Sequence, residues 1–170
     1  MDIKLNQSDL EEFRLVEELE REIDNNTDDE YTIRVLEEMR VQQPMFYIGL
    51  LSFSLELTKE EFEELMKNFF LIWEYFKLKP NVLTNKFTDD YFFKIQNRNF
   101  EVQIYIEDAS TRNEKLDIFT QDLQGIRSLS LFLTVLNRLN VRPALEQMSM
   151  FKKCLVMVDL KSFIECFDSF

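Results

Sequence analysis

The chain contains no histidine, and this absence narrows the chemistry that its remaining residues can perform. Histidine is the most common general base near neutral pH, so Ser-His-Asp and Cys-His catalytic arrangements are excluded. The only glycines are Gly49 and Gly125, whereas phosphate-binding and dinucleotide-binding loops need clustered glycines. Carboxylates and two cysteines are therefore the remaining candidates for catalysis or metal binding.

One acidic segment has the outline of a calcium-binding loop. Residues 24–35 begin with oxygen-bearing side chains at alternate positions, as such loops do. Asp29, however, stands where the sharp turn needs glycine, and Val35 stands where a bidentate glutamate is needed. A capped turn between two helices is the better interpretation of this segment.

Two further acidic groups are candidates for holding a divalent ion. Asp89 and Asp90 follow Thr88, and a helix cap or a turn into a strand explains this pair better than a metal site. Four glutamates lie within residues 60–64, at the start of an amphipathic segment, where the helix dipole favours acidic side chains. We therefore expect no metal ion and no cofactor.

The two cysteines, Cys154 and Cys166, do not form a CxxC pair. The doublet Lys152-Lys153 precedes Cys154 and is the kind of charge that activates a thiol, but a small, buried and unreactive thiol is the preferred interpretation. Two reduced cysteines suit a cytoplasmic protein. The sequence predicts neither a signal peptide nor a membrane span.

Hydrophobic residues spaced by three and four predict four helices in the N-terminal half, at about 9–24, 28–42, 44–56 and 59–76. Three of these helices begin with a capping-box pattern, in which Ser8, Thr27 or Thr58 is followed three residues later by glutamate. Pro44 suits the first turn of the third helix, which is apolar nearly all round and is expected to be buried.

Aromatic residues dominate the apolar composition. The chain has 17 phenylalanines, which predict a bulky aromatic core. Trp73 lies near the middle of the apolar arc of the helix at 59–76, so we interpret it as a core residue rather than as the wall of a ligand pocket.

The hydrophobic period changes after Pro80. Apolar residues alternate with polar ones along 100–107, which predicts a strand, and 91–96 joined to it through an asparagine-rich turn completes a central β-hairpin. Helices return towards the C-terminus, while 115–119 and 154–158 fit either a strand or a helix. These patterns predict an α+β, predominantly helical fold.

The length of 170 residues is most simply one domain, 1–170. The weakest boundary follows the helix at 59–76, and it leaves open a subdivision into an acidic helical half, 1–78, and an α/β half, 88–170.

Negative charge is concentrated in the first third of the chain. Residues 1–64 contain 19 acidic and six basic residues, whereas residues 65–170 contain 13 acidic and 14 basic residues. Acidic helix faces keep a phenylalanine-rich protein soluble, but they also attract basic partners. The candidate partner-binding face consists of Glu11, Glu18, Glu22, Glu60, Glu61, Glu63 and Glu64.

The sequence favours a non-enzymatic, intracellular protein-binding module, such as an adaptor, an inhibitor, or an antitoxin-like or chaperone-like neutraliser of a basic protein. A variant is mimicry of nucleic acid by carboxylates. The alternatives are a carboxylate- or metal-dependent enzyme, and an assembly protein that forms homo-oligomers through the apolar segment 44–55. Binding to nucleic acid is not expected, because Lys152-Lys153 is the only basic doublet.

Overall fold

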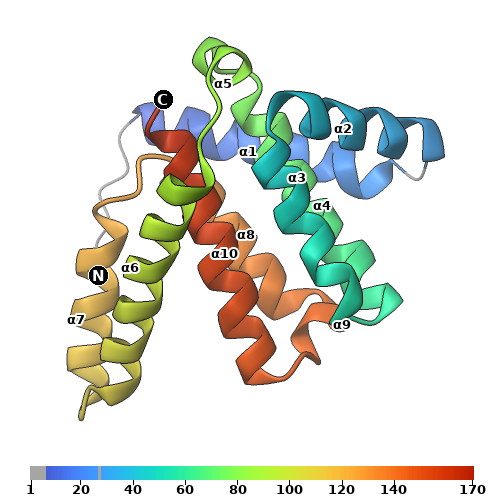
Figure 1. The fold of residues 1–170 in the computed structure, drawn as a ribbon. Helices are drawn as coiled ribbons and strands as arrows, with labels where there is room; N and C mark the ends of the chain where they lie inside the picture. The colour runs from blue at the N-terminus through green and yellow to red at the C-terminus, as the bar shows by residue number, and fades with distance from the viewer. Residues whose placement is uncertain (1–6, 27) are drawn as a thin grey trace.

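The computed structural model describes residues 7–26 and 28–170, without the side chains of Ser8 and Asp9. Every regular element in these residues is a helix, and none is a strand (Figure 1). The elements are α1 (Gln7–Asn25), α2 (Asp29–Gln42), α3 (Pro44–Ser52), the 3-10 turn η1 (Phe53–Leu55), α4 (Lys59–Phe76), α5 (Pro80–Thr84), α6 (Asp89–Asp108), α7 (Arg112–Leu123), α8 (Leu129–Val141), α9 (Pro143–Glu146) and α10 (Met150–Asp168).

The four helices predicted in the N-terminal half are present. The capping box at Thr58 is confirmed by two reciprocal hydrogen bonds. The Thr58 hydroxyl accepts a hydrogen bond from the Glu61 backbone amide, and the Glu61 carboxylate accepts one from the Thr58 backbone amide at 2.8 Å. The box predicted at Thr27 lies outside the described residues, and Asp28 caps α2 instead. The helix α1 begins at Gln7, and the side chain of Ser8 is not described.

The predicted β-hairpin, and with it the α+β class, is wrong. Both predicted strands, 91–96 and 100–107, lie inside the single helix α6, whose first turn is capped by the Thr88 hydroxyl. The predicted strand would bury one face that includes Ile104, but this side chain is 56% exposed. Buried and half-buried positions of α6 recur at the helical spacing of three and four, and they include Phe92, Ile95, Asn99, Val102 and Ile106.

The error arose because the two-residue period of a strand and the helical spacing of three and four can place apolar residues at the same positions. Val102 and Ile106 are two steps apart in an alternating pattern and one turn apart on a helix, so their identity does not distinguish the two structures. The deciding residue is Asn99, which the hairpin prediction placed in the turn between the two strands. It is 3% exposed and donates to Ser162 of α10 at 2.9 Å, so it marks the centre of a helix–helix contact.

The ambiguous segments are also helical. Residues 115–119 belong to α7, which begins with a second capping box formed by Thr111 and Glu114, and 154–158 belong to α10. Figure 1 shows α10 running between α6 on one side and α3 and α4 on the other. None of the described helices is both long enough and apolar enough to cross a bilayer.

The core is built from phenylalanine rings around α10, as the composition predicts. Phe163 stacks on Phe92 of α6, with ring centroids 4.2 Å apart, and meets Phe46 of α3 edge-on at 5.0 Å. One turn later, Phe167 stacks on Phe76 of α4 at 4.8 Å. Aromatic pairs at these separations add about 0.5–1.5 kcal/mol each beyond the area they bury. Three other helices are thus joined to α10 through aromatic contacts.

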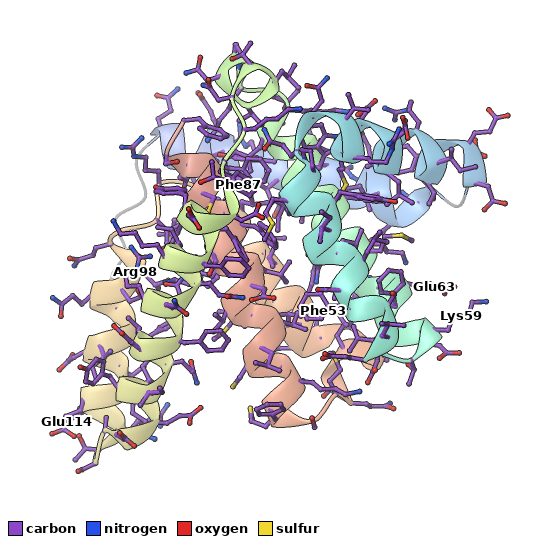
Figure 2. The ribbon with its side chains drawn as sticks, viewed as in Figure 1. Phe53, Lys59, Glu63, Phe87, Arg98 and Glu114 are labelled. Atoms are coloured by element: carbon purple, nitrogen blue, oxygen red, sulfur yellow. The ribbon has the colours of Figure 1, made fainter. Side chains whose placement is uncertain are left out.

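The segment between α5 and α6 adds another ring to this core. Phe87 lies there, 7% exposed, and its ring meets Phe167 edge-on at 5.2 Å (Figure 2). A buried ring in a connecting segment fixes the start of α6 against the C-terminal end of α10.

The helix α3 is only half buried, contrary to the expectation for an all-round apolar segment. Phe46 and Leu50 are fully buried, but Ile48 is 57% exposed and Leu51 is 41% exposed. Leu55 in η1 is 93% exposed. One face of α3 therefore packs on the core, and the other presents aliphatic side chains to solvent.

Gly49 is the point of closest approach between α3 and α10. A β-carbon added at this position would lie 2.3 Å from the ring atom Cζ of Phe163. The backbone at Gly49 has no positive φ, so the requirement for glycine is one of space between helices. Since Phe46 and Phe92 pack against the ring of Phe163, it has little room to move aside.

Replacing Gly49 with alanine is expected to lower the free energy of unfolding by about 2 kcal/mol, because overpacking outweighs the better helix propensity of alanine. Urea unfolding followed by circular dichroism measures this change. Gly125→Ala is the matched control, since its added β-carbon meets only the Asp122 carbonyl oxygen at 3.5 Å. Equal stability of the two variants would contradict the close helix contact.

Asp159 of α10 faces α6 and accepts a hydrogen bond from Gln96. Burial, with a smaller contribution from the charge of Glu56, raises the pKa of Asp159 to about 6, although the Gln96 bond opposes this rise. A raised pKa means that folding favours the protonated form. The resulting stabilisation is full below pH 3.8, the ordinary pKa, and is lost as the pH rises through about 6.

Asp159→Asn is therefore expected to make the protein more stable at pH 7.5 by about 2 kcal/mol, while the wild type and the variant converge near pH 4. Asparagine keeps an acceptor for Gln96 but cannot ionise. The measurement is the difference in urea unfolding free energy between the two proteins across this pH range. A difference that does not change with pH would show that Asp159 titrates normally.

Candidate functional site

A hollow lined by several carboxylates lies between α2, α4 and α9. It has a volume of ≈ 640 Å³ and is called the acidic groove below. Glu60, Glu63 and Glu64 of α4 line one side, and Asp29 at the start of α2 lines another. The remaining lining residues are Asn26, Thr32, Met66, Lys67, Arg142, Pro143 and Ala144.

The predicted α4 residues have different roles at this groove. Glu60 and Glu63 are exposed, and Lys59 lies near Glu63 at 3.6 Å (Figure 2). Glu64 turns inward, where Lys67 lies at 2.6 Å. Glu61 does not line the groove, because its carboxylate is engaged with the helix cap and with Lys152 of α10 at 3.5 Å.

The predicted α1 residues are exposed but form a separate surface. The intervals between Glu11, Glu18 and Glu22 are seven and four residues, which places these side chains on one side of α1. None of them lines the acidic groove. Glu22 lies close enough to Tyr31 to contribute to the raised pKa of that phenol, which is caused mainly by burial and by Glu74. The structure therefore divides the predicted acidic face into two parts.

A buried arginine lies behind the acidic groove. Arg138 of α8 is 1% exposed, and its guanidinium is held by side chains of two other helices, α1 and α4. Its Nε donates to Asn68 of α4 at 2.7 Å, its Nη1 donates to Glu20 of α1 at 2.8 Å, and its Nη2 donates to Asp24 at 3.0 Å. The Oε2 atom of Glu64 lies 3.7 Å from the same guanidinium.

Arg142, at the C-terminal end of α8, adds a second cation to this network. It contacts Glu20 at 3.3 Å and is hydrogen-bonded to Asp24. Burial alone would raise the pKa of Asp24, but the hydrogen bonds and charges of Arg138 and Arg142 outweigh burial and hold that pKa below 3.8. The stabilisation from this pairing is therefore present above pH 3.8 and is lost in acid as Asp24 protonates.

Folding cancels part of the charge asymmetry along the chain. Arg138 and Arg142 come from the nearly neutral part of the sequence, yet both pair with carboxylates of α1. Lys77 likewise pairs with Glu38 of α2 at 3.2 Å. The acidic groove keeps its surplus, because its two lining cations, Lys67 and Arg142, are already engaged by carboxylates.

Two residues of this network were missed by the sequence analysis, although the sequence contains a signal for them. Arg138 falls on the apolar stripe of α8 between Val135 and Leu139, and Asn68 falls beside Phe69 on the apolar stripe of α4. A polar residue on a buried helical stripe needs a partner. The identity of the partners depends on how the helices cross, which the sequence does not show.

The other candidates for chemistry are accounted for by packing. Trp73 is 1% exposed, as predicted for a core residue, and its indole N–H donates to Glu38 at 3.1 Å. Burial, assisted by the charge of Glu107, raises the pKa of the Cys154 thiol, so this cysteine is not activated. In the described part of the chain, no three acidic or cysteine side chains are placed to share a metal ion.

The fold and these contacts define an all-helical protein with a buried ionic network. Comparison of the chain with protein-family models, with curated proteins and with solved structures found no match.

Arg138→Met is expected to lower the free energy of unfolding by about 3–5 kcal/mol, because Glu20, Asp24 and Glu64 lose the buried cation that they share and keep only the more exposed Arg142 and Lys67. Urea unfolding at neutral pH measures the loss. Arg40→Met is the matched control, since its pair with Glu37 is 56% exposed on both sides and its removal is expected to change little. Equal effects of the two substitutions would contradict the role assigned to Arg138.

Proposed function

We propose that the protein is a non-enzymatic protein-binding module of the cytoplasm, and that its acidic groove takes a basic segment of a partner protein. The supporting observation is the surplus of carboxylate at the groove. Four carboxylates line it; Glu64 is paired with Lys67 and Glu63 with Lys59, whereas the other lining cation, Arg142, is engaged by carboxylates of α1. The two free cysteines are compatible with the proposed compartment.

The charges that carry this proposal are Glu60, Glu63 and Asp29. All three are exposed and line the groove, and within the described residues Glu60 and Asp29 have no basic side chain within 4 Å. A concave surface lined by one sign of charge raises the local concentration of oppositely charged groups and accelerates encounter. The partner segment is therefore expected to be rich in lysine or arginine.

The uncharged lining of the groove also suits such side chains. Met66, Pro143 and Ala144 provide apolar surface beside the carboxylates. Lysine and arginine bury their aliphatic stems on apolar surface while their charged ends remain near acidic groups and water. A groove that combines both features is better suited to a basic peptide segment than to a small inorganic cation.

A second candidate function is assembly with further copies of this chain. The observation that favours it is the exposed aliphatic face of α3 and η1, formed by Ile48, Leu51 and Leu55. Light scattering at high protein concentration tests this candidate, and a strictly monomeric protein would exclude it.

The double variant Glu60→Gln, Glu63→Gln is expected to weaken binding of a fluorescent arginine-rich peptide by about tenfold at low salt. The physical reason is the loss of two carboxylate charges at the groove, of which that of Glu63 is partly offset by Lys59. Fluorescence anisotropy measures the dissociation constant, and the wild-type affinity is expected to fall as salt rises.

Glu11→Gln, Glu18→Gln is the matched control, because it removes the same charge from the separate α1 surface. An equal loss of affinity in both double variants would indicate binding to the overall negative field instead of the acidic groove. Affinity that does not depend on salt would contradict an acidic recognition mechanism. A catalytic or nucleic-acid-binding role would require a different site.

A further inference from the structure

A second cavity, unrelated to the acidic groove, lies between α6, α7, α8 and α10. Its volume is ≈ 270 Å³. The helix α7 runs beside α6 at the edge of the molecule, and the label of Glu114 in Figure 2 marks the end at which α7 begins. Most of the lining is apolar, and these apolar residues are Val102, Ile106, Leu116, Phe119, Phe132, Met157 and Val158.

On the side of α7, side chains fill the cavity incompletely. This helix has no fully buried residue, although Leu116, Phe119 and Leu123 recur at helical spacing as an apolar stripe. Leu116 is 50% exposed, whereas Phe132 and Val158 on the opposite wall are each 1% exposed. The cavity therefore deepens from an open end at the start of α7 to a closed end at α8 and α10.

The closed end contains a lysine whose charge is already satisfied. Lys161 is 4% exposed and donates to Asn99 at 2.5 Å and to Asp122 at 2.9 Å. Glu165 lies 3.3 Å from the same ammonium. Two carboxylates on one buried lysine leave no attraction for another anion, so the closed end suits the uncharged part of a ligand.

The open end has the opposite character. Arg112 and Lys115 line it, and within the described residues neither has a carboxylate within 4 Å. Lys115 donates to the Glu107 carbonyl oxygen at 3.3 Å, which leaves other donor positions of its ammonium open. Within the described residues, two cations without a carboxylate partner therefore stand at the mouth of an apolar cavity.

We propose that this cavity binds a linear carboxylate with an alkyl tail, a medium-chain fatty acid in chemical class. The tail lies along the apolar walls towards Phe132 and Val158, and the carboxylate meets Arg112 and Lys115 at the mouth. An engineered cavity of about 150 Å³ holds benzene, so by proportion this cavity holds about ten non-hydrogen atoms. Octanoate matches that size.

The test is titration of the full-length protein with octanoate, followed by thermal unfolding and by calorimetry. Octanoate is expected to raise the melting temperature in a concentration-dependent manner, because it binds only the folded state. Octanol should bind more weakly, and octyltrimethylammonium should not compete. Equal binding of octanoate and octanol would overturn the assignment of the headgroup to the two cations.

Arg112→Gln, Lys115→Gln is expected to weaken octanoate binding about tenfold while leaving octanol binding unchanged. Both side chains are at the surface, so folding should persist. Lys94→Gln is the control, since Lys94 is exposed on α6 and does not line the cavity. Loss of octanoate affinity in the control, or none in the double variant, would overturn the proposal.

A second variant tests the cavity itself. Val102→Phe places a larger side chain in the space between α6 and α7, and it is expected to abolish binding of both octanoate and octanol. Circular dichroism confirms that the variant is folded before titration. Unchanged octanoate affinity in a folded Val102→Phe protein would place the ligand elsewhere and contradict the proposal.

Discussion

The buried guanidinium of Arg138 is the interaction on which the arrangement of α1, α4 and α8 depends. A charge that is 1% exposed is tolerated only when its hydrogen-bonding positions and its charge are matched. Glu20 and Asp24 supply the charge, and Asn68 supplies a neutral acceptor. These groups come from different helices, so the network fixes how those helices cross. The phenylalanine core alone does not select one arrangement so sharply, because apolar packing is not directional.

This network changes the meaning of the acidic N-terminal region. Several of its carboxylates are structural, since they neutralise cations that the C-terminal part contributes through Arg138, Arg142, Lys77 and Lys152. Counting charge along the sequence overstates the acidity of the folded surface. Unpaired carboxylates remain at the acidic groove and along one side of α1, and these are the ones that bear on the proposed partner.

The sequence predicts local structure well wherever local chemistry decides it. Thr58 and its capping box locate α4 correctly, and the seventeen phenylalanines predict the aromatic core. Prediction fails at α6, where alternating apolar residues such as Ile104 imitate a strand and the deciding contact, that of Asn99 with α10, is long-range. The arrangement of the acidic residues could not be read from the sequence for the same reason. Whether Glu64 faces solvent or Arg138 depends on how α8 packs on α4. The contact that brings these helices together there joins Arg138 to Asn68, 70 residues apart in the chain.

The distribution of buried contacts divides the molecule into a tightly held body and a looser edge. Around Phe163 and Arg138, several helices share rings or ion pairs, so local opening there breaks many contacts together. The helix α7 has no fully buried residue, and the cavity beneath it replaces part of the packing that would hold it. Regions with few buried contacts open at lower free energy than the core, and binding sites are drawn from such regions. A ligand that fills the cavity would add contacts to α7, so its binding would stabilise the packed position of this helix.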